Sequence, residues 1–72
     1  MTIEDKILAA AEEEFYRSGF DATSTSRIAQ SVGVTHAMVN YYFRTKEQLF
    51  LHVLDSHVEK AIVVLRDIMR GH

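Results

Sequence analysis

The chain has 72 residues, a formal net charge of −2 and no cysteine, so we expect a single domain without disulfides or thiolate metal sites. Its first residues, MTIEDK, carry acids where a signal peptide would be basic, and apolar runs such as AIVVL at 61–65 are far too short to span a bilayer. These features predict a soluble, cytoplasmic protein.

The first predicted helix runs from Glu4 to Ser18. Its apolar residues follow the three-and-four spacing of a helix with one buried face: Ile7, Leu8, Ala11 and Phe15. Gly19 ends this helix, because glycine takes the left-handed conformation of a helix end without steric strain. The acidic run at 12–14 is expected to face solvent, with Glu13 and Arg17 four residues apart for a weak ion pair.

The second and third predicted helices are short. Ser24 or Thr23 can cap the second helix, which stops at Gly33. Thr35 can cap the third helix, which runs to about Tyr42.

The fourth predicted helix begins at Thr45 and Gln48, which have the spacing of a capping box. It can continue to Met69 or Arg70, because no proline interrupts it and Gly71 comes late. Since no segment has the pattern of a strand, the predicted fold class is all-α.

The second and third helices, with the SVGV segment between them, match the helix-turn-helix pattern. Ala29 is small where the two helices approach closely, and Gly33 supplies the positive φ of the turn. The expected scaffold comprises Ile28, Ala29, Val32, Gly33, Val34, Val39 and Phe43. A helical corner with no nucleic-acid role is the alternative interpretation of this pattern.

The charge distribution favours a polyanion on this part of the chain. Residues 22 to 46 contain Arg27, Arg44 and Lys46 and no acid, whereas the residues before them are strongly acidic. A surface that faces phosphates requires such a segment, because a carboxylate there would oppose binding.

If the corner binds DNA, the helix at 35–42 enters the major groove. Val39 and Phe43 face the core, and Tyr42 lies at the boundary. The outward residues are Thr35, His36, Ala37, Asn40 and Tyr41. Asparagine can pair with adenine, histidine can donate to guanine, and threonine and alanine can contact a thymine methyl group.

The segment ILAAAEEEFYRSGFDATSTSRIAQSVGVTHAMVNYYFRTKEQLF resembles the DNA-binding head of the TetR family of bacterial transcriptional repressors. The resemblance covers residues 7 to about 54 and is carried by an IL.AA...F...G first helix, a T....IA...GV second helix and turn, and a YF..K..L entry to the fourth helix. It implies phosphate contacts from Thr25, Tyr42 and Lys46, and base or backbone contacts from Ser26, Thr35, His36, Ala37 and Asn40. The family often has lysine, glycine and tyrosine in place of His36, Ala37 and Asn40, so the base preference does not carry over. The resemblance also implies a homodimer, a palindromic operator, and repression released by a small-molecule inducer.

The end of the fourth helix is expected to lack a partner within this chain. Residues 61–65 are apolar on every side, and such a helix should be buried all round. We therefore expect a DNA-binding domain at 1–55 and a connector at 56–72. The connector would lead to a C-terminal helical domain for ligand binding and dimerisation that this chain does not include. The rival hypothesis is a protein-interaction module that uses the apolar strip at 58–69.

Enzymatic and metal-binding functions find no support in the sequence. The chain has no phosphate-binding glycine loop and no interpretable catalytic constellation. His52 and His57 lie about 140° apart around a helix and cannot share one metal ion. No cofactor is expected.

Overall fold

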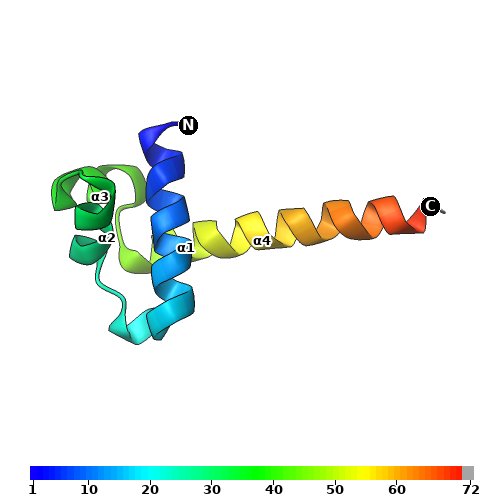
Figure 1. The fold of residues 1–72 in the computed structure, drawn as a ribbon, viewed down its shortest axis with the longest axis horizontal. Helices are drawn as coiled ribbons and strands as arrows, with labels where there is room; N and C mark the ends of the chain where they lie inside the picture. The colour runs from blue at the N-terminus through cyan, green and yellow to red at the C-terminus, as the bar shows by residue number, and fades with distance from the viewer. Residues whose placement is uncertain (71–72) are drawn as a thin grey trace.

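The computed structural model describes residues 1–70, and these form four α-helices and no strand. The helices are α1 (Ile3–Ala22), α2 (Thr25–Val32), α3 (His36–Phe43) and α4 (Lys46–Met69). The first three pack with the start of α4 into a head, from which the rest of α4 projects (Figure 1). The all-α prediction is confirmed, while Gly71 and the end of the predicted connector at 56–72 lie outside the described residues.

Helix α1 differs from its prediction at both ends. It begins one residue earlier than predicted, and Thr2 and Asp5 form a capping box at its start. Gly19 has φ 80° and ψ 170°, so it is not in the left-handed helical conformation expected for it. This region is accessible essentially to glycine alone. It kinks the chain, and a further turn reaches Ala22 before the helix ends.

Local caps position the two short helices. The Ser24 side chain accepts from the backbone N–H of Arg27, and Thr35 caps α3 in the same way. Thr23, the alternative cap for α2, is instead buried and donates its hydroxyl proton toward the carbonyl oxygens of Glu14 and Gly19 at 3.1 and 2.7 Å. This side chain ties the loop between α1 and α2 back onto α1.

The link between α3 and α4 consists of Arg44 and Thr45. Thr45 accepts from the N–H of Gln48, but its own N–H donates to the Phe43 carbonyl oxygen at 2.7 Å, so the predicted capping box is only half formed. That bond closes a γ-turn around Arg44, whose φ of 67° and ψ of −60° are unusual for a residue with a Cβ. The turn reverses the chain with two residues.

The core lies where all four helices meet. Its buried apolar residues are Ile7, Ala11, Phe15, Ile28, Ala29, Val39, Phe43, Leu49 and Val53, while Leu8 is half-buried. The acidic run on α1 does not face solvent throughout, because Glu14 is buried and its Oε2 has no hydrogen-bond partner among residues 1–70. Its Oε1 accepts from Arg17 at 3.2 Å, and Arg17 also pairs with Glu13 at 2.6 Å.

The distal part of α4, from residue 58 onward, contributes no side chain to the core. Every residue from 58 to 70 is exposed, including the large apolar side chains Val58, Ile62, Val63, Val64, Leu65, Ile68 and Met69. This arrangement leaves the apolar strip at 58–69 without a partner within residues 1–70. None of the described helices combines the length and the hydropathy that a bilayer crossing requires.

Candidate nucleic-acid interface

The helix-turn-helix scaffold is assembled from α2, the turn and α3. Ile28 and Ala29 are buried on α2, Val39 and Phe43 are buried on α3, and Val32 and Val34 pack against the core beside the turn. Gly33 has φ 81° and ψ 29°, the left-handed conformation that ends α2, and its N–H donates to the carbonyl oxygen of Ala29 at 3.0 Å. The core contacts therefore fix the orientation of α3.

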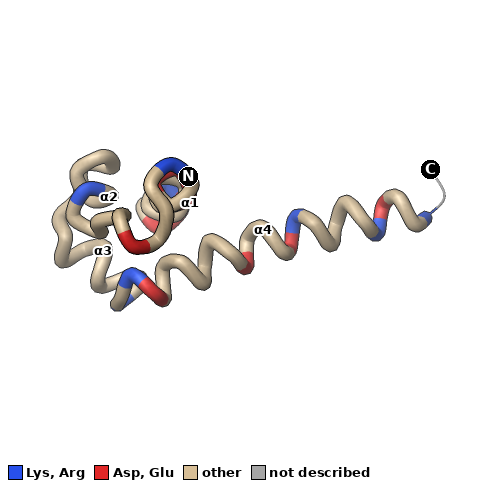
Figure 2. Tube along the Cα trace, turned by 90° about the horizontal axis from the view of Figure 1, so that it is seen from below, with Lys and Arg blue, Asp and Glu red and all other residues tan. Residues whose placement is uncertain are grey.

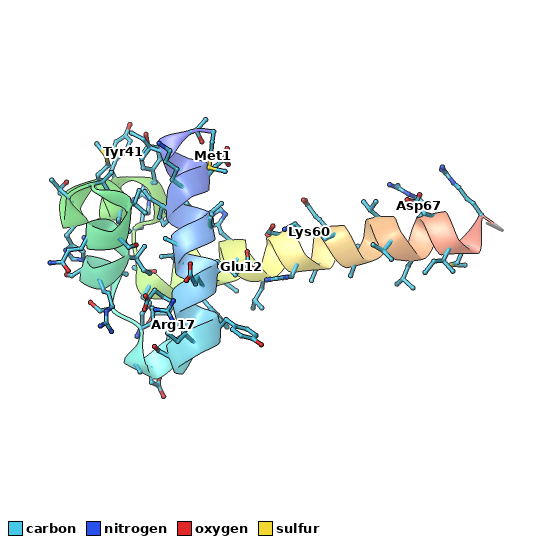
Figure 3. The ribbon with its side chains drawn as sticks, viewed as in Figure 1. Met1, Glu12, Arg17, Tyr41, Lys60 and Asp67 are labelled. Atoms are coloured by element: carbon cyan, nitrogen blue, oxygen red, sulfur yellow. The ribbon has the colours of Figure 1, made fainter. Side chains whose placement is uncertain are left out.

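The predicted contact residues of α3 lie outside the core. The exposed set comprises Thr35, His36, Ala37, Asn40, Tyr41 and Tyr42. Tyr41 is 79% exposed and Tyr42 38%, and their rings meet edge to face at 5.3 Å. Figure 3 shows Tyr41 at the same end of the head as Met1 and away from the projecting part of α4. These side chains can therefore reach an external ligand without any rearrangement of the core.

The first residues of α2 and α3 meet at the surface. Thr25 Oγ1 lies 2.7 Å from His36 Nε2, within hydrogen-bond distance. Ser26 is exposed next to Thr25. The short distance shows that the N-terminal ends of both helices lie side by side. These ends carry free backbone N–H groups and partial positive charge that suit a phosphate.

Lys46 was predicted only as a phosphate contact, but in the structure its ammonium binds backbone carbonyl oxygens within the head. Its ammonium donates to the carbonyl oxygens of Phe20 and Thr23 at 2.8 and 3.1 Å, and to that of Asp21 at 3.4 Å. It also lies 4.5 Å from the centre of the Phe20 ring. Since an ammonium has three N–H donors, a phosphate contact by Lys46 would replace one of these bonds. The predicted phosphate contact stays a prediction.

Two further cations stand in the acid-free segment and were not among the predicted contacts. Arg27 on α2 and Arg44 between α3 and α4 are both exposed, and Figure 2 shows Lys and Arg at these parts of the head. Neither guanidinium has an acidic partner within 4.0 Å among residues 1–70. The lack of carboxylates at 22–46 indicates that this segment faces a polyanion, but it does not single out these two arginines as contacts.

The histidines of α4 lie apart from these residues. His52 is exposed and its ring meets Phe43 edge to face at 5.1 Å, whereas His57 Nε2 lies 3.1 Å from Glu12 Oε1 on α1. Within residues 1–70 no group of three or more His, Cys, Asp or Glu side chains could hold a metal ion.

Two short helices joined by a left-handed glycine turn, with the second helix exposed on its outer face, define a helix-turn-helix domain of the DNA-binding class. A family model described as bacterial regulatory proteins of the tetR family matches residues 7–53. The chain belongs to the TetR family of transcriptional regulators, and it carries the DNA-binding helix-turn-helix domain of that family. Membership confirms the resemblance and the expectation that the chain is not an enzyme.

Several curated HTH-type transcriptional regulators are similar to this chain in sequence. The HTH-type transcriptional regulator QacR of Staphylococcus aureus is 38% identical over 60 residues, which cover 83% of this chain and 32% of that protein. The activator FasR of Mycolicibacterium smegmatis is 32% identical over 65 residues, or 90% of this chain and 30% of that protein. The repressor BdcR of Escherichia coli is 30% identical over 66 residues, which cover 92% of this chain and 34% of that protein. The chain thus spans about a third of the length of these curated relatives.

Proposed function

We propose that the chain binds double-stranded DNA sequence-specifically, with the helix at 35–42 in the major groove. The observation that carries this proposal is the arrangement of α2 and α3, whose N-terminal ends meet within an acid-free segment while the outer side of α3 stays exposed. The proposed base-facing residues are Thr35, His36, Ala37, Asn40 and Tyr41, and the proposed phosphate-facing residues are Thr25, Ser26 and Tyr42, with Lys46 retained as a prediction. Arg27 and Arg44 supply free positive charge for the flanking phosphates.

The salt dependence of binding tests the proposed role of the cations. The logarithm of affinity should fall with the logarithm of salt at a slope of about −2 to −3 if two or three cations contact phosphate. Arg27→Gln and Arg44→Gln should each lower the steepness of that slope by about 1. Arg17→Gln is the matched control, since Arg17 is paired with Glu13 and Glu14 on α1. Binding that does not change with salt would contradict the proposal.

The location of binding can be measured by amide NMR titration with a mixed-sequence duplex at low salt. Shifts confined to residues 24–46 would support the proposed interface. An absence of shifts there, with broadening along 58–69, would contradict it and favour a protein-interaction role for the apolar strip.

We place dimer formation and inducer binding in a C-terminal domain outside this chain, with 1–55 as the DNA-binding unit and 56–72 as the connector. The exposed apolar side chains at 58–69 support this division, because a helix that is apolar all round needs a cover. Two heads would then read a palindrome with half-sites about 34 Å apart. Sedimentation at rising concentration tests self-association through the strip, with Val64→Glu expected to weaken it more than Lys60→Glu. If the chain stays a monomer at all concentrations, the exposed apolar strip at 58–69 no longer supports the proposed division of the chain.

Repression released by an inducer, acting on DNA in the cytoplasm, is the proposed mode of action. The names of the relatives include both a repressor and an activator, so a reporter gene placed behind the operator must decide the sign. Expression that rises when the regulator is deleted supports repression, and expression that falls shows activation.

A further inference from the structure

The hydrogen bond between Thr25 and His36 lies at the proposed interface. The two side chains are 11 residues apart in sequence, and the 2.7 Å contact is between exposed parts of both. The core contains neither residue, so the bond is not required for packing. It connects a predicted phosphate contact on α2 to a predicted base contact on α3.

The chemistry of the two groups allows two arrangements. A neutral imidazole has one N–H and one lone pair, and a hydroxyl has one proton to donate. Either the Thr25 hydroxyl donates to a bare Nε2, or Nε2–H donates to Oγ1. In the first arrangement the hydroxyl proton is already used. In the second it is free.

A phosphate oxygen only accepts hydrogen bonds, so Thr25 must donate its proton to make the phosphate contact. Oγ1 can then still accept from His36, but only from an Nε2–H. A DNA phosphate that binds the Thr25 hydroxyl is therefore compatible only with the arrangement in which His36 Nε2–H donates to Oγ1.

We propose that His36 is a positioning residue for Thr25: phosphate binding selects the Nε2–H form of the imidazole, which holds Oγ1 and aims the hydroxyl proton at the DNA. This inference rests on the proposed function. In the neutral Nε2–H form, Nδ1 carries a lone pair, which accepts from the amino groups of adenine or cytosine and cannot donate to guanine. The pair thus links a backbone contact to the base preference of α3.

A double-mutant cycle on DNA affinity tests the coupling. His36→Ala should weaken binding about 3- to 10-fold more in the presence of the Thr25 hydroxyl than in Thr25→Val, the magnitude expected for one hydrogen bond. A base contact of His36 that does not depend on Thr25 is lost in both backgrounds and cancels, so the cycle reports only what the two residues do together. His36→Gln, with an amide donor near the position of Nε2, should retain much of the coupling. The parallel cycle with Ser26→Ala is the control, because Ser26 makes no hydrogen bond to His36.

The tautomer itself is measured from the imidazole ¹⁵N shifts of the 72-residue chain, which distinguish the Nε2–H, Nδ1–H and doubly protonated forms of the ring. Addition of the duplex should move the two nitrogens of His36 toward the Nε2–H pattern, whereas His52 should not change. Unaltered His36 shifts, a move toward the Nδ1–H form, or additive mutations with DNA still bound would overturn the inference and leave the proposed function standing. An absence of amide shifts at 24–46 would overturn both.

Discussion

Lys46→Met should destabilise the head because it removes the ammonium while retaining most of the side-chain length. The ammonium makes two hydrogen bonds of good length, to the carbonyl oxygens of Phe20 and Thr23, and a longer one to that of Asp21. Its position 4.5 Å from the Phe20 ring adds a cation–π contact. Phe20 packs in turn on Phe15 and Phe50, so the lysine holds the end of α1 against the start of α4.

The expected loss is smaller than the sum of these contacts. A hydrogen bond to a charged group contributes about 1.5 to 3 kcal/mol, but Lys46 is half-buried and water can reach the carbonyl oxygens in its absence. The Phe20 carbonyl oxygen also retains the N–H of Thr23 at 3.3 Å. We therefore expect a decrease of about 2 kcal/mol in the free energy of unfolding. For a domain of this size, such a decrease in the free energy of unfolding lowers Tm by about 8 to 16 °C.

Thermal unfolding followed by circular dichroism, without DNA, measures the effect. Arg44→Met is the matched control: it removes an exposed cation two residues away that makes no side-chain ion pair within 4.0 Å among residues 1–70, and Tm should hardly change. Suppose instead that Lys46→Met leaves Tm unaltered and weakens DNA binding as strongly as Arg44→Met does. The ammonium would then act as a phosphate contact, and the structural role assigned to it would be wrong.

Four further substitutions test other parts of the fold by chemical denaturation. Gly33→Ala should destabilise the head by about 1 kcal/mol, because the left-handed region disfavours a Cβ. Gly19→Ala should destabilise it by about 2 to 3 kcal/mol, because φ 80° and ψ 170° are accessible essentially to glycine alone. Neither added Cβ meets another atom within 4 Å, so equal losses of stability would contradict the backbone argument. Glu14→Leu should stabilise by about 1 kcal/mol, because it replaces a buried carboxylate whose Oε2 has no partner in the described residues. Glu13→Leu at an exposed site is its control, and a loss of stability in Glu14→Leu would show that the pair with Arg17 outweighs desolvation. Arg44→Gly should raise stability by about 1 kcal/mol by relieving the positive φ, and a midpoint below that of the wild type would indicate an unrecognised side-chain contact of Arg44.

The helices and the fold class could be predicted because their signals are local. Ser24 and Thr35 are hydroxyl caps, and each acts on a backbone N–H three residues later. The apolar spacing of Ile7, Ala11 and Phe15 likewise reflects one helix face. Such features depend on neighbours within a few residues, which a sequence displays directly.

The contacts that the sequence did not reveal join distant residues. Lys46 meets carbonyl groups 23 to 26 residues earlier, and His36 meets a hydroxyl on another helix. Glu14 looks like part of a solvated acidic run in the sequence, but its side chain is buried in the folded head. In each case the residue type is compatible with several environments, and only the packing of the helices selects one.

The two-residue link between α3 and α4 makes α4 a lever on the helix that faces the proposed groove. At 1.5 Å per residue, the 24 residues of α4 extend about 36 Å. A tilt that displaces its far end by about 3 Å therefore turns its base by about 5°. Arg44 and Thr45 offer few torsions in which such a rotation could be absorbed, since the γ-turn bond already constrains them. A small displacement at the exposed end of α4 would thus reach α3 as a change of angle.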